Sequence, residues 1–255
     1  GAHSSVVGDR PIQQSFPLPR EVERRAAYFC SQAQGAHRVL LLGGYPGGLA
    51  AGLLRYPVTR VEQVEQDRTA FERVRAYLDD AGRAALEDPR LVLQFGDGRR
   101  FLRHLEPDAR YDLILSLDAT PSSAASNRYF TREAFALVRE HLTTNGVFCT
   151  QVSAASNYLG SAVGGYAGSV YRTLGEVFAQ VVLVPGDSQI FCASETLGRL
   201  TEDPEELQRR YLATALSDQA GRSSCTPGLS AVPGCHSLPL GAFASMLPRE
   251  GVAYL

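Results

Sequence analysis

The chain has 255 residues, of which 44% are hydrophobic and 20% charged, so it is long enough to bury a full core. Its net charge of −2 gives no electrostatic reason to expect binding to nucleic acid or to an anionic membrane surface. All 25 basic residues are arginine, which excludes a Schiff-base lysine and a Walker A phosphate site.

Two segments precede the first expected strand. Residues 1–20 contain three prolines, so we expect an irregular segment there. Residues 21–34 carry Val22, Ala26 and Phe29 at helical spacing, which predicts a helix. No apolar run in the chain reaches the roughly 18 residues that span a membrane, and no signal peptide is visible.

The next segment is the most informative one. An apolar run at 38–42 leads into a loop that contains Gly43, Gly44 and Gly47, and a helix of small residues is expected at 49–54. This order is typical of a buried parallel strand, a tight turn and a helix whose N-terminus faces a ligand. Glycines there let the backbone approach a bound group closely.

Acidic residues close the strands that follow. The second strand ends at Glu65, about 20 residues beyond the glycines, which is the spacing of a carboxylate that binds ribose hydroxyls. A third strand at 91–95 leads into Asp97, and a fourth at 111–117 leads into Asp118. Each of these residues taken alone could equally be an ordinary turn residue. Together they predict a polar ligand site at one edge of the sheet, where open α/β folds bind their ligands.

The remaining pattern alternates helices and strands. Helices are expected at 69–78, 99–105, 131–141, 166–178 and 203–215, and strands at 146–152, 180–184 and 189–193. We therefore predict an α/β fold, with a doubly wound, mostly parallel Rossmann-like sheet that ends in a C-terminal antiparallel hairpin. The expected parts are a truncated N-terminal segment and helix (1–37), a nucleoside-binding domain (38–197) and a helical and loop extension (198–255).

The five cysteines do not form a paired metal-binding pattern. Cys149 and Cys192 lie in apolar, strand-like runs, so we expect both to be small core residues. Cys225, Cys235 and His236 could be metal ligands or include a disulfide, but they lack a Cys-x-x-Cys spacing. We therefore expect no metal site.

The order of the motifs resembles the spermidine synthase (polyamine aminopropyltransferase) family, a branch of the S-adenosylmethionine-dependent methyltransferase fold. The resemblance spans residues 38–194, and no single motif in it is specific, whereas their order is. It is carried by Leu42-Gly43-Gly44-x-x-Gly47-Gly48, Val64-Glu65-Gln66-Asp67, Asp88-Pro89-Arg90, Gly96-Asp97-Gly98-Arg99, Tyr111-Asp112-Leu113-Ile114, Tyr129-Phe130-Thr131-Arg132-Glu133, Thr150-Gln151 and Tyr171-Arg172-Thr173-Leu174.

Other segments point to one subgroup of that family. Residues 127–131, 184–187 and 191–194 are most similar to the subgroup in which this domain is fused to membrane-spanning segments. This resemblance implies a soluble domain on the cytoplasmic side of an inner-membrane protein, with membrane-spanning segments in the full-length chain. It also suggests a homodimer.

The resemblance implies a site for S-adenosylmethionine or its decarboxylated form as donor substrate. Glu65 matches the acid that holds the ribose hydroxyls, and Asp97 matches the acid that recognises the adenine amino group. The other residues that we assign to the nucleoside and sulfonium site are Gly43, Gly44, Gly47, Gln66 and Gly98.

The residues expected to bind and deprotonate the acceptor depart from the family pattern. Members carry an aspartate in the glycine loop, where Pro46 falls here, and Asp-x-x-Asp-Pro after the fourth strand. Aligned on Pro121, the two aspartate positions hold Leu117 and Thr120, and the carboxylate of Asp118 is shifted by one residue. In the family the first aspartate helps to deprotonate the attacking amine and the second binds the polyamine. Without them, we do not expect putrescine to be the acceptor.

Three residues remain as candidates for the catalytic half. We assign Asp118 as general base and expect Gln151 and Tyr129 to orient a small-molecule amine or other acceptor. Tyr129 could instead be a core-packing residue. The glycines and tyrosines of residues 157–168 fit a hinged lid over the site.

Three functions are compatible with this pattern. The first is a spermidine-synthase-like transferase that moves an aminopropyl or related group to an unidentified acceptor. The second is a nucleoside-binding or scaffold module without catalysis. The third is a methyltransferase, which needs no aminopropyl-binding aspartate.

Overall fold

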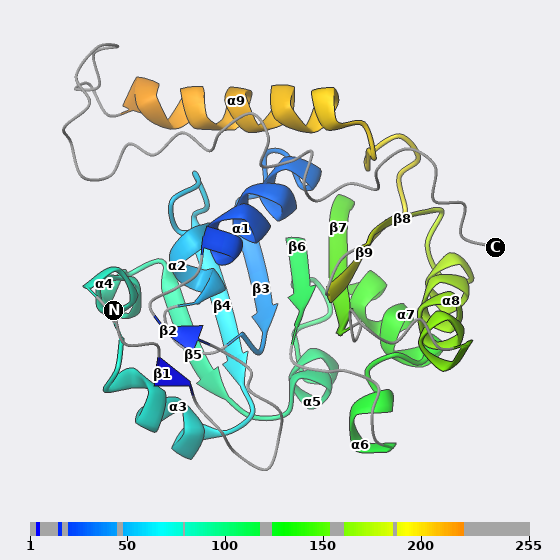
Figure 1. Ribbon diagram of the computed structural model, residues 1–255, viewed down its shortest axis with the longest axis horizontal. Helices are drawn as coiled ribbons and strands as arrows, with labels where there is room; N and C mark the ends of the chain where they lie inside the picture. Colours follow the sequence, from blue (N-terminus) through cyan, green and yellow to red (C-terminus); the bar gives the residue numbers. More distant parts are fainter. Residues whose placement is uncertain are drawn as a thin grey trace.

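A seven-stranded mixed sheet runs through the protein in the computed structural model (Figure 1). Its strands are β3 (Arg38–Leu42), β4 (Arg60–Glu65), β5 (Leu91–Phe95), β6 (Tyr111–Ser116), β7 (Leu142–Ser153), β8 (Gln180–Val184) and β9 (Ser188–Ser194). Their order is β5-β4-β3-β6-β7-β9-β8. The first five are parallel, and β9 runs antiparallel to both β7 and β8. The predicted doubly wound sheet with an antiparallel end is confirmed.

Nine helices and a second, two-stranded sheet are found among the described residues, which are 4–5, 15–16, 20–44, 48–78, 80–117, 124–153, 161–185 and 188–221. The helices are α1 (Arg20–Gln32), α2 (Leu49–Leu53), α3 (Arg68–Arg75), α4 (Asp80–Glu87), α5 (Gly98–Arg103), α6 (Ala124–Asn127), α7 (Arg132–Glu140), α8 (Ser161–Gly175) and α9 (Pro204–Gly221). The small sheet pairs β1 (Ser4–Ser5) with β2 (Ser15–Phe16).

Some elements differ from the expectations. The β1–β2 pair lies in the segment expected to be irregular, because two-residue strands are too short to leave a hydrophobic period. Helix α4 was missed because only Gly82 and Ala85 are buried in it, which gives a weak apolar stripe. Strand β7 begins four residues before the expected 146–152, since Leu142 already pairs with Tyr111 ahead of a register shift.

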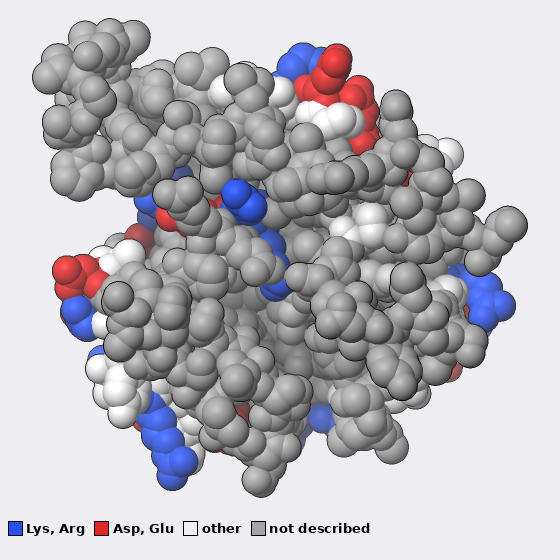
Figure 2. Space-filling model, viewed as in Figure 1, with Lys and Arg blue, Asp and Glu red and all other residues white. Residues whose placement is uncertain are grey.

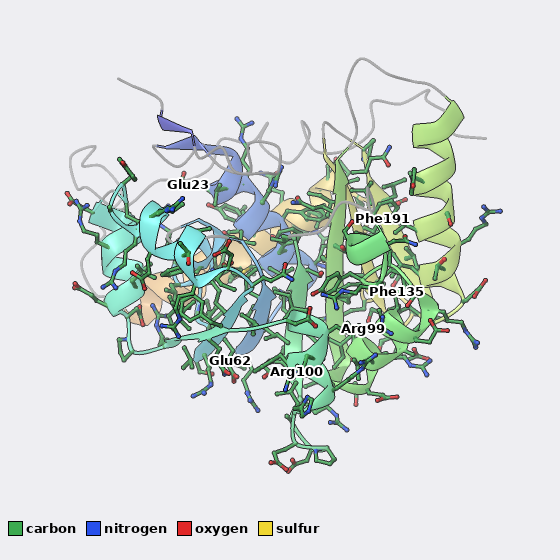
Figure 3. All side chains as sticks on the ribbon, turned by 90° about the horizontal axis from the view of Figure 1, so that it is seen from below. Glu23, Glu62, Arg99, Arg100, Phe135 and Phe191 are labelled. Atoms are coloured by element: carbon green, nitrogen blue, oxygen red, sulfur yellow. A yellow bond between two sulfur atoms is a disulfide. The ribbon has the colours of Figure 1, made fainter. Side chains whose placement is uncertain are left out.

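Helices cover both faces of the sheet, as Figures 1 and 3 show. Alternate residues of β3 supply the two cores: Val39 and Leu41 face one side, and Leu40 and Leu42 face the other. The first core also contains buried residues of α1, α2 and α9. The second contains residues of α5, α7 and α8, and includes Phe135 and Phe191 (Figure 3). The carboxyl ends of the parallel strands are thus held rigidly between two packed layers.

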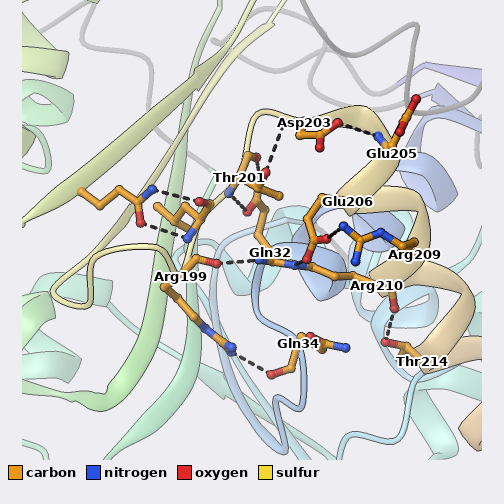
Figure 4. A network of polar contacts seen from close by, with 12 residues as sticks. Gln32, Gln34, Arg199, Thr201, Asp203, Glu205, Glu206, Arg209, Arg210 and Thr214 are labelled. Carbon is orange, nitrogen blue, oxygen red and sulfur yellow. Dashed lines mark hydrogen bonds and ion pairs between the residues drawn. The ribbon is translucent and has the colours of Figure 1, made fainter.

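The first part of the C-terminal extension packs on α1 (Figure 4). The Gln32 amide donates to the carbonyl of Thr201 at 2.7 Å and accepts from the Thr201 N–H at 3.1 Å. Leu207 of α9 is fully buried in the first core. Helix α9 therefore contributes to the core, whereas residues 222–255, which include Cys225, Cys235 and His236, lie outside the described part of the chain.

The two strand cysteines are bonded to each other. Cys149 on β7 and Cys192 on β9 are paired in register, fully buried, and form a disulfide with their Cα atoms 4.2 Å apart. The expectation that both are small core residues is confirmed, but their disulfide was not predicted. Burial was expected correctly, but the antiparallel register that makes the two residues opposite neighbours is not visible in either strand alone.

The Asp88-Pro89-Arg90 motif holds the α2–β4 connection to the start of β5. The Arg90 guanidinium donates to the carbonyls of Leu54 at 2.7 Å and Val58 at 3.3 Å, and to Asp88 Oδ2 at 2.7 Å. These hydrogen bonds lower the pKa of Asp88 from its usual value. Leu54 is the C-terminal cap of α2, so the guanidinium satisfies carbonyls that the short helix leaves open.

We expect Arg90→Met to lower the free energy of unfolding by about 1–3 kcal/mol, because several backbone acceptors lose a charged donor. Arg73→Met, which removes an exposed arginine of α3, is the matched control and should leave stability within about 0.5 kcal/mol. The difference in unfolding free energy between the wild type and Arg90→Met should shrink as the pH falls below about 4. Asp88 then becomes protonated, so the wild type also loses the stabilisation from the Asp88–Arg90 pair. Urea titrations at two pH values measure both effects, and equal losses for the two variants would contradict the assignment.

Candidate functional site

The glycine turn after β3 lies where the sheet changes direction. β3 pairs with β4 on one side and β6 on the other, so the chain crosses the sheet from this point in both directions. Gly43 and Gly44 have φ angles of 80° and 110°, which L side chains rarely adopt. The Gly43 N–H donates to the Val64 carbonyl at 2.9 Å and fixes the turn against β4. Gly47 lies outside the described residues.

Glu65 ends β4 beside this turn. Its side chain is 4% exposed, and its Oε1 accepts a hydrogen bond from Gln63 Nε2 at 2.6 Å. Gln63 and Glu65 are two residues apart on one strand, so both side chains lie on the same face. Gln63 therefore orients the carboxylate. Gln66 follows on the surface of the protein.

Asp97 follows β5 and begins the helix α5. Its Oδ1 accepts from the Arg100 N–H at 2.8 Å, as an N-cap residue does. A Cβ atom at the next residue, Gly98, would lie 3.3 Å from Leu42 Cδ2. The absence of a side chain at Gly98 thus lets the first turn of α5 approach the end of β3.

The second oxygen of Asp97 is also bound. Its Oδ2 accepts from the Tyr129 hydroxyl at 2.6 Å and from the Arg128 guanidinium, which also lies over the Tyr129 ring with 4.9 Å between Cζ and the ring centroid. Burial acts to raise the pKa of Asp97, but the hydrogen bonds from Tyr129 and the Arg100 N–H and the charge of Arg128 outweigh it and lower the pKa. Asp97 is therefore a carboxylate at neutral pH.

The two acids lie at the ends of neighbouring strands. Glu65 pairs in register with Phe95, and its carbonyl accepts from the Gly96 N–H at 2.9 Å. Asp97 follows two residues after Phe95. The structure thus brings Glu65, Asp97 and the Gly43-Gly44 turn to one edge of the sheet, as the sequence predicted.

The acceptor side of the edge is formed by β6, β7 and α1. Leu117 follows β6 and packs against the first core. Gln151 Nε2 donates to the Leu117 carbonyl at 2.9 Å, and Gln151 Oε1 accepts from Arg25 of α1 at 2.9 Å. Figure 2 shows blue basic side chains, with red acidic ones beside them, at the place that α1 occupies in Figure 1. Asp118 lies outside the described residues.

Tyr129 lies beside Asp97. Its hydroxyl contacts Asp97, while its ring packs against the second core. The role of Tyr129 in orienting the acceptor stays a prediction. Of the lid expected at 157–168, residues 161–168 form the first half of α8, and the others lie outside the described part.

Sequence reasoning missed two arginines of this edge. Arg25 reaches Gln151 from α1, 126 residues away along the chain, and no local pattern marks it. Arg128 stands next to Tyr129 within a segment that carried the family resemblance, but its pairing with Asp97 joins the connection between α6 and α7 to the start of α5. Neither contact has a sequence spacing that predicts it.

Comparison with known families decides the classification. The spermine/spermidine synthase domain matches residues 27–182, which include both acids and the glycine turn. The chain belongs to this family. The expected resemblance is confirmed.

Curated relatives of the family match a shorter stretch. The polyamine aminopropyltransferase of Korarchaeum cryptofilum is 32% identical over 117 residues, which cover 46% of this chain and 36% of that protein. The polyamine aminopropyltransferase of Nitrosomonas europaea is 36% identical over 116 residues, or 45% of this chain and 35% of that protein. The matched part thus spans little more than a third of these two relatives.

Solved structures share the fold of this family member. A spermidine synthase in complex with the transition-state analogue AdoDATO has a TM-score of 0.63 at 19% identity and covers 80% of this chain and 74% of its own. Human methyltransferase-like protein 13 in complex with SAH has a TM-score of 0.54 at 16% identity, with coverages of 82% and 94%. These likenesses confirm the methyltransferase-type α/β fold.

The described residues form neither a cluster of metal-ligating side chains nor a helix fit to span a membrane. Across the described ranges, no group of three or more His, Cys, Asp or Glu side chains is placed to hold a metal ion. Among the helices that the structure describes, none has the length and apolar character needed to cross a bilayer.

Proposed function

We propose that this chain is an aminopropyltransferase-type domain that binds S-adenosylmethionine or its decarboxylated form and transfers an aminopropyl or related group to an acceptor not yet identified. The observation that carries the proposal is the pair of carboxylates, Glu65 and Asp97, at neighbouring strand ends beside a glycine turn with positive φ angles.

The nucleoside half of the edge fits an adenosyl group. The Glu65 carboxylate, held at one oxygen by Gln63, would accept from the two ribose hydroxyls. The Asp97 carboxylate would accept from the adenine amino group. Gly43 and Gly44 place no side chain in the turn, which supports close approach of the nucleoside and sulfonium.

The transfer needs little covalent chemistry from the protein. A neutral amine nitrogen of the acceptor would attack the carbon beside the sulfonium, while the carbon–sulfur bond breaks and its electron pair goes to sulfur. The attacking nitrogen then gives a proton to a base, for which Asp118 is the candidate by sequence. The protein's main tasks are to position the acceptor and to exclude water.

The acceptor half is less suited to a polyamine. Leu117, in the place of the first family aspartate, packs into an apolar core, so it offers no charge to a dication. Gln151 is held between Arg25 and the Leu117 carbonyl and would present a polar but neutral group. We therefore propose an acceptor other than putrescine.

The contacts of Gln151 also support a second candidate function for the chain. Both ends of its amide are bonded to protein groups, as expected where no acceptor needs it. A nucleoside-binding module without catalysis would keep Glu65 and Asp97 while its acceptor side closes. Such a module would bind the nucleoside but release no product.

We also propose that the domain is joined to membrane-spanning segments in a longer protein, on the cytoplasmic side. The support is the likeness of residues 127–131 and 184–187 to the membrane-fused subgroup of the family.

Calorimetric titration with methylthioadenosine, S-adenosylmethionine and decarboxylated S-adenosylmethionine tests the proposal. We expect methylthioadenosine to bind, because it carries the adenosyl group that Glu65 and Asp97 would hold. Preference for the decarboxylated donor favours aminopropyl transfer, and preference for S-adenosylmethionine favours the methyltransferase. Binding without methylthioadenosine release in the presence of amines favours the non-catalytic module. No binding of any of the three would overturn the proposal.

A further inference from the structure

Three protein donors already bind the carboxylate of Asp97. Its Oδ1 is turned toward the first turn of α5, where it accepts from the Arg100 N–H at 2.8 Å. Its Oδ2 accepts from both Arg128 and the Tyr129 hydroxyl. A carboxylate oxygen has two lone pairs, so the two donors use the acceptor capacity of Oδ2.

We take Oδ2 as the oxygen that an adenine amino group would use, because Oδ1 is bound at the first turn of α5. The amino group is a donor, as the Tyr129 hydroxyl and the Arg128 guanidinium are, and it gains nothing from Oδ2 while both lone pairs of that oxygen are taken. Ligand and protein therefore compete for one atom of the site.

We propose that Asp97, Arg128 and Tyr129 form a latch that adenosine must open, so that Arg128 and Tyr129 limit the affinity of the site for its nucleoside. This inference rests on the proposed function, because it takes Asp97 as the group that binds adenine.

The contacts around the latch allow it to open by side-chain rotation. The backbone near it is held, since Arg99 of α5 donates to the Arg128 carbonyl at 2.9 Å and the Tyr129 N–H donates to the Ser126 carbonyl at 3.1 Å. The Arg128 side chain is 42% exposed, so its guanidinium has access to water once it leaves Asp97. The latch thus opens without unfolding its surroundings.

The exposure of the pair also limits its strength. Asp97 is 22% exposed in its side chain, and an ion pair in contact with water is worth little. The latch therefore lowers the affinity of the site without abolishing it.

Calorimetric titration of methylthioadenosine against single variants tests the latch. Arg128→Met keeps most of the side-chain length and removes the charge, and Tyr129→Phe removes only the hydroxyl. We expect each to bind methylthioadenosine about two- to tenfold more tightly than the wild type. Arg103→Met, which removes an exposed arginine of α5, controls for the change in net charge and should bind as the wild type does. Thermal unfolding of each variant checks its fold.

Salt dependence gives a second measurement. Methylthioadenosine is uncharged, so salt affects its binding mainly through the Arg128–Asp97 pair. We expect higher salt to tighten binding in the wild type and to have little effect in Arg128→Met.

The outcomes separate this inference from the proposed function. Unchanged or weaker binding by folded Arg128→Met and Tyr129→Phe, with binding by the wild type, would overturn the latch alone. Binding by Arg128→Met where the wild type shows none would support it strongly. If neither the wild type nor any variant binds methylthioadenosine, the proposed function fails and the latch with it.

Discussion

Glu65→Gln is expected to weaken methylthioadenosine binding by about 10- to 100-fold. The substitution keeps the shape of the side chain and removes its charge, so the ribose hydroxyls lose hydrogen bonds to a carboxylate, which are worth about 1.5–3 kcal/mol. The glutamine can still accept from Gln63, because its amide oxygen can take the place of Glu65 Oε1. The fold should therefore survive, and calorimetry measures the change.

The same strand provides a matched control. Glu62 is also buried, at 6% exposure, but it pairs with Arg60 at 2.8 Å at the amino end of β4. Glu62→Gln makes the same chemical change nearer the amino end of the same strand. It should lower the free energy of unfolding while leaving the affinity for methylthioadenosine unchanged. If both variants weaken methylthioadenosine binding equally, the loss of a buried charge on β4 lowers the affinity by disturbing the fold. The assignment of Glu65 to the ribose hydroxyls would then be wrong.

Removal of the disulfide is expected to have the largest effect on stability. The double variant Cys149→Ala/Cys192→Ala should lose about 2–4 kcal/mol of unfolding free energy, because the bond closes a loop of 43 residues and joins β7 to β9 within the sheet. For a folded domain of this size, such a loss lowers the melting temperature by roughly 5–15 °C.

A free cysteine in the described part of the chain supplies the control for this experiment. Cys30 is buried on α1 with no disulfide partner, so Cys30→Ala measures the loss of one buried thiol without a bond. Because reduction breaks the bond without a substitution, the wild type is compared as isolated and after reduction, with alkylation and mass spectrometry to report the state of Cys149 and Cys192. A reduced wild type as stable as the oxidised protein would contradict the stabilising role.

The position of the two acids and the glycine turn was predictable from the sequence because these residues follow local rules. Glycines after a buried strand and an acid about 20 residues later fix positions on neighbouring strands of a parallel sheet, whatever the details of packing. Glu65 and Asp97 therefore lie together as expected. The strand at 180–184 was predicted with its observed bounds, since an apolar run that ends at a proline-glycine turn leaves little freedom.

The contacts that close the site were not predictable in the same way. The pairings of Arg128 with Asp97 and of Arg25 with Gln151 join segments 31 and 126 residues apart. They depend on how helices pack over the sheet, which no sequence period records. The disulfide was missed for a related reason, because it follows from the register of β9 against β7 and not from either strand.

A crystal structure of the protein with methylthioadenosine tests the central claim most directly. We expect the ribose hydroxyls at the Glu65 carboxylate and the adenine amino group at Asp97 Oδ2, with the Arg128 guanidinium turned away from Asp97. A nucleoside bound elsewhere in the protein would contradict the account. So would a structure at saturating ligand in which the Asp97–Arg128 pair is unchanged and no nucleoside lies between Glu65 and Asp97.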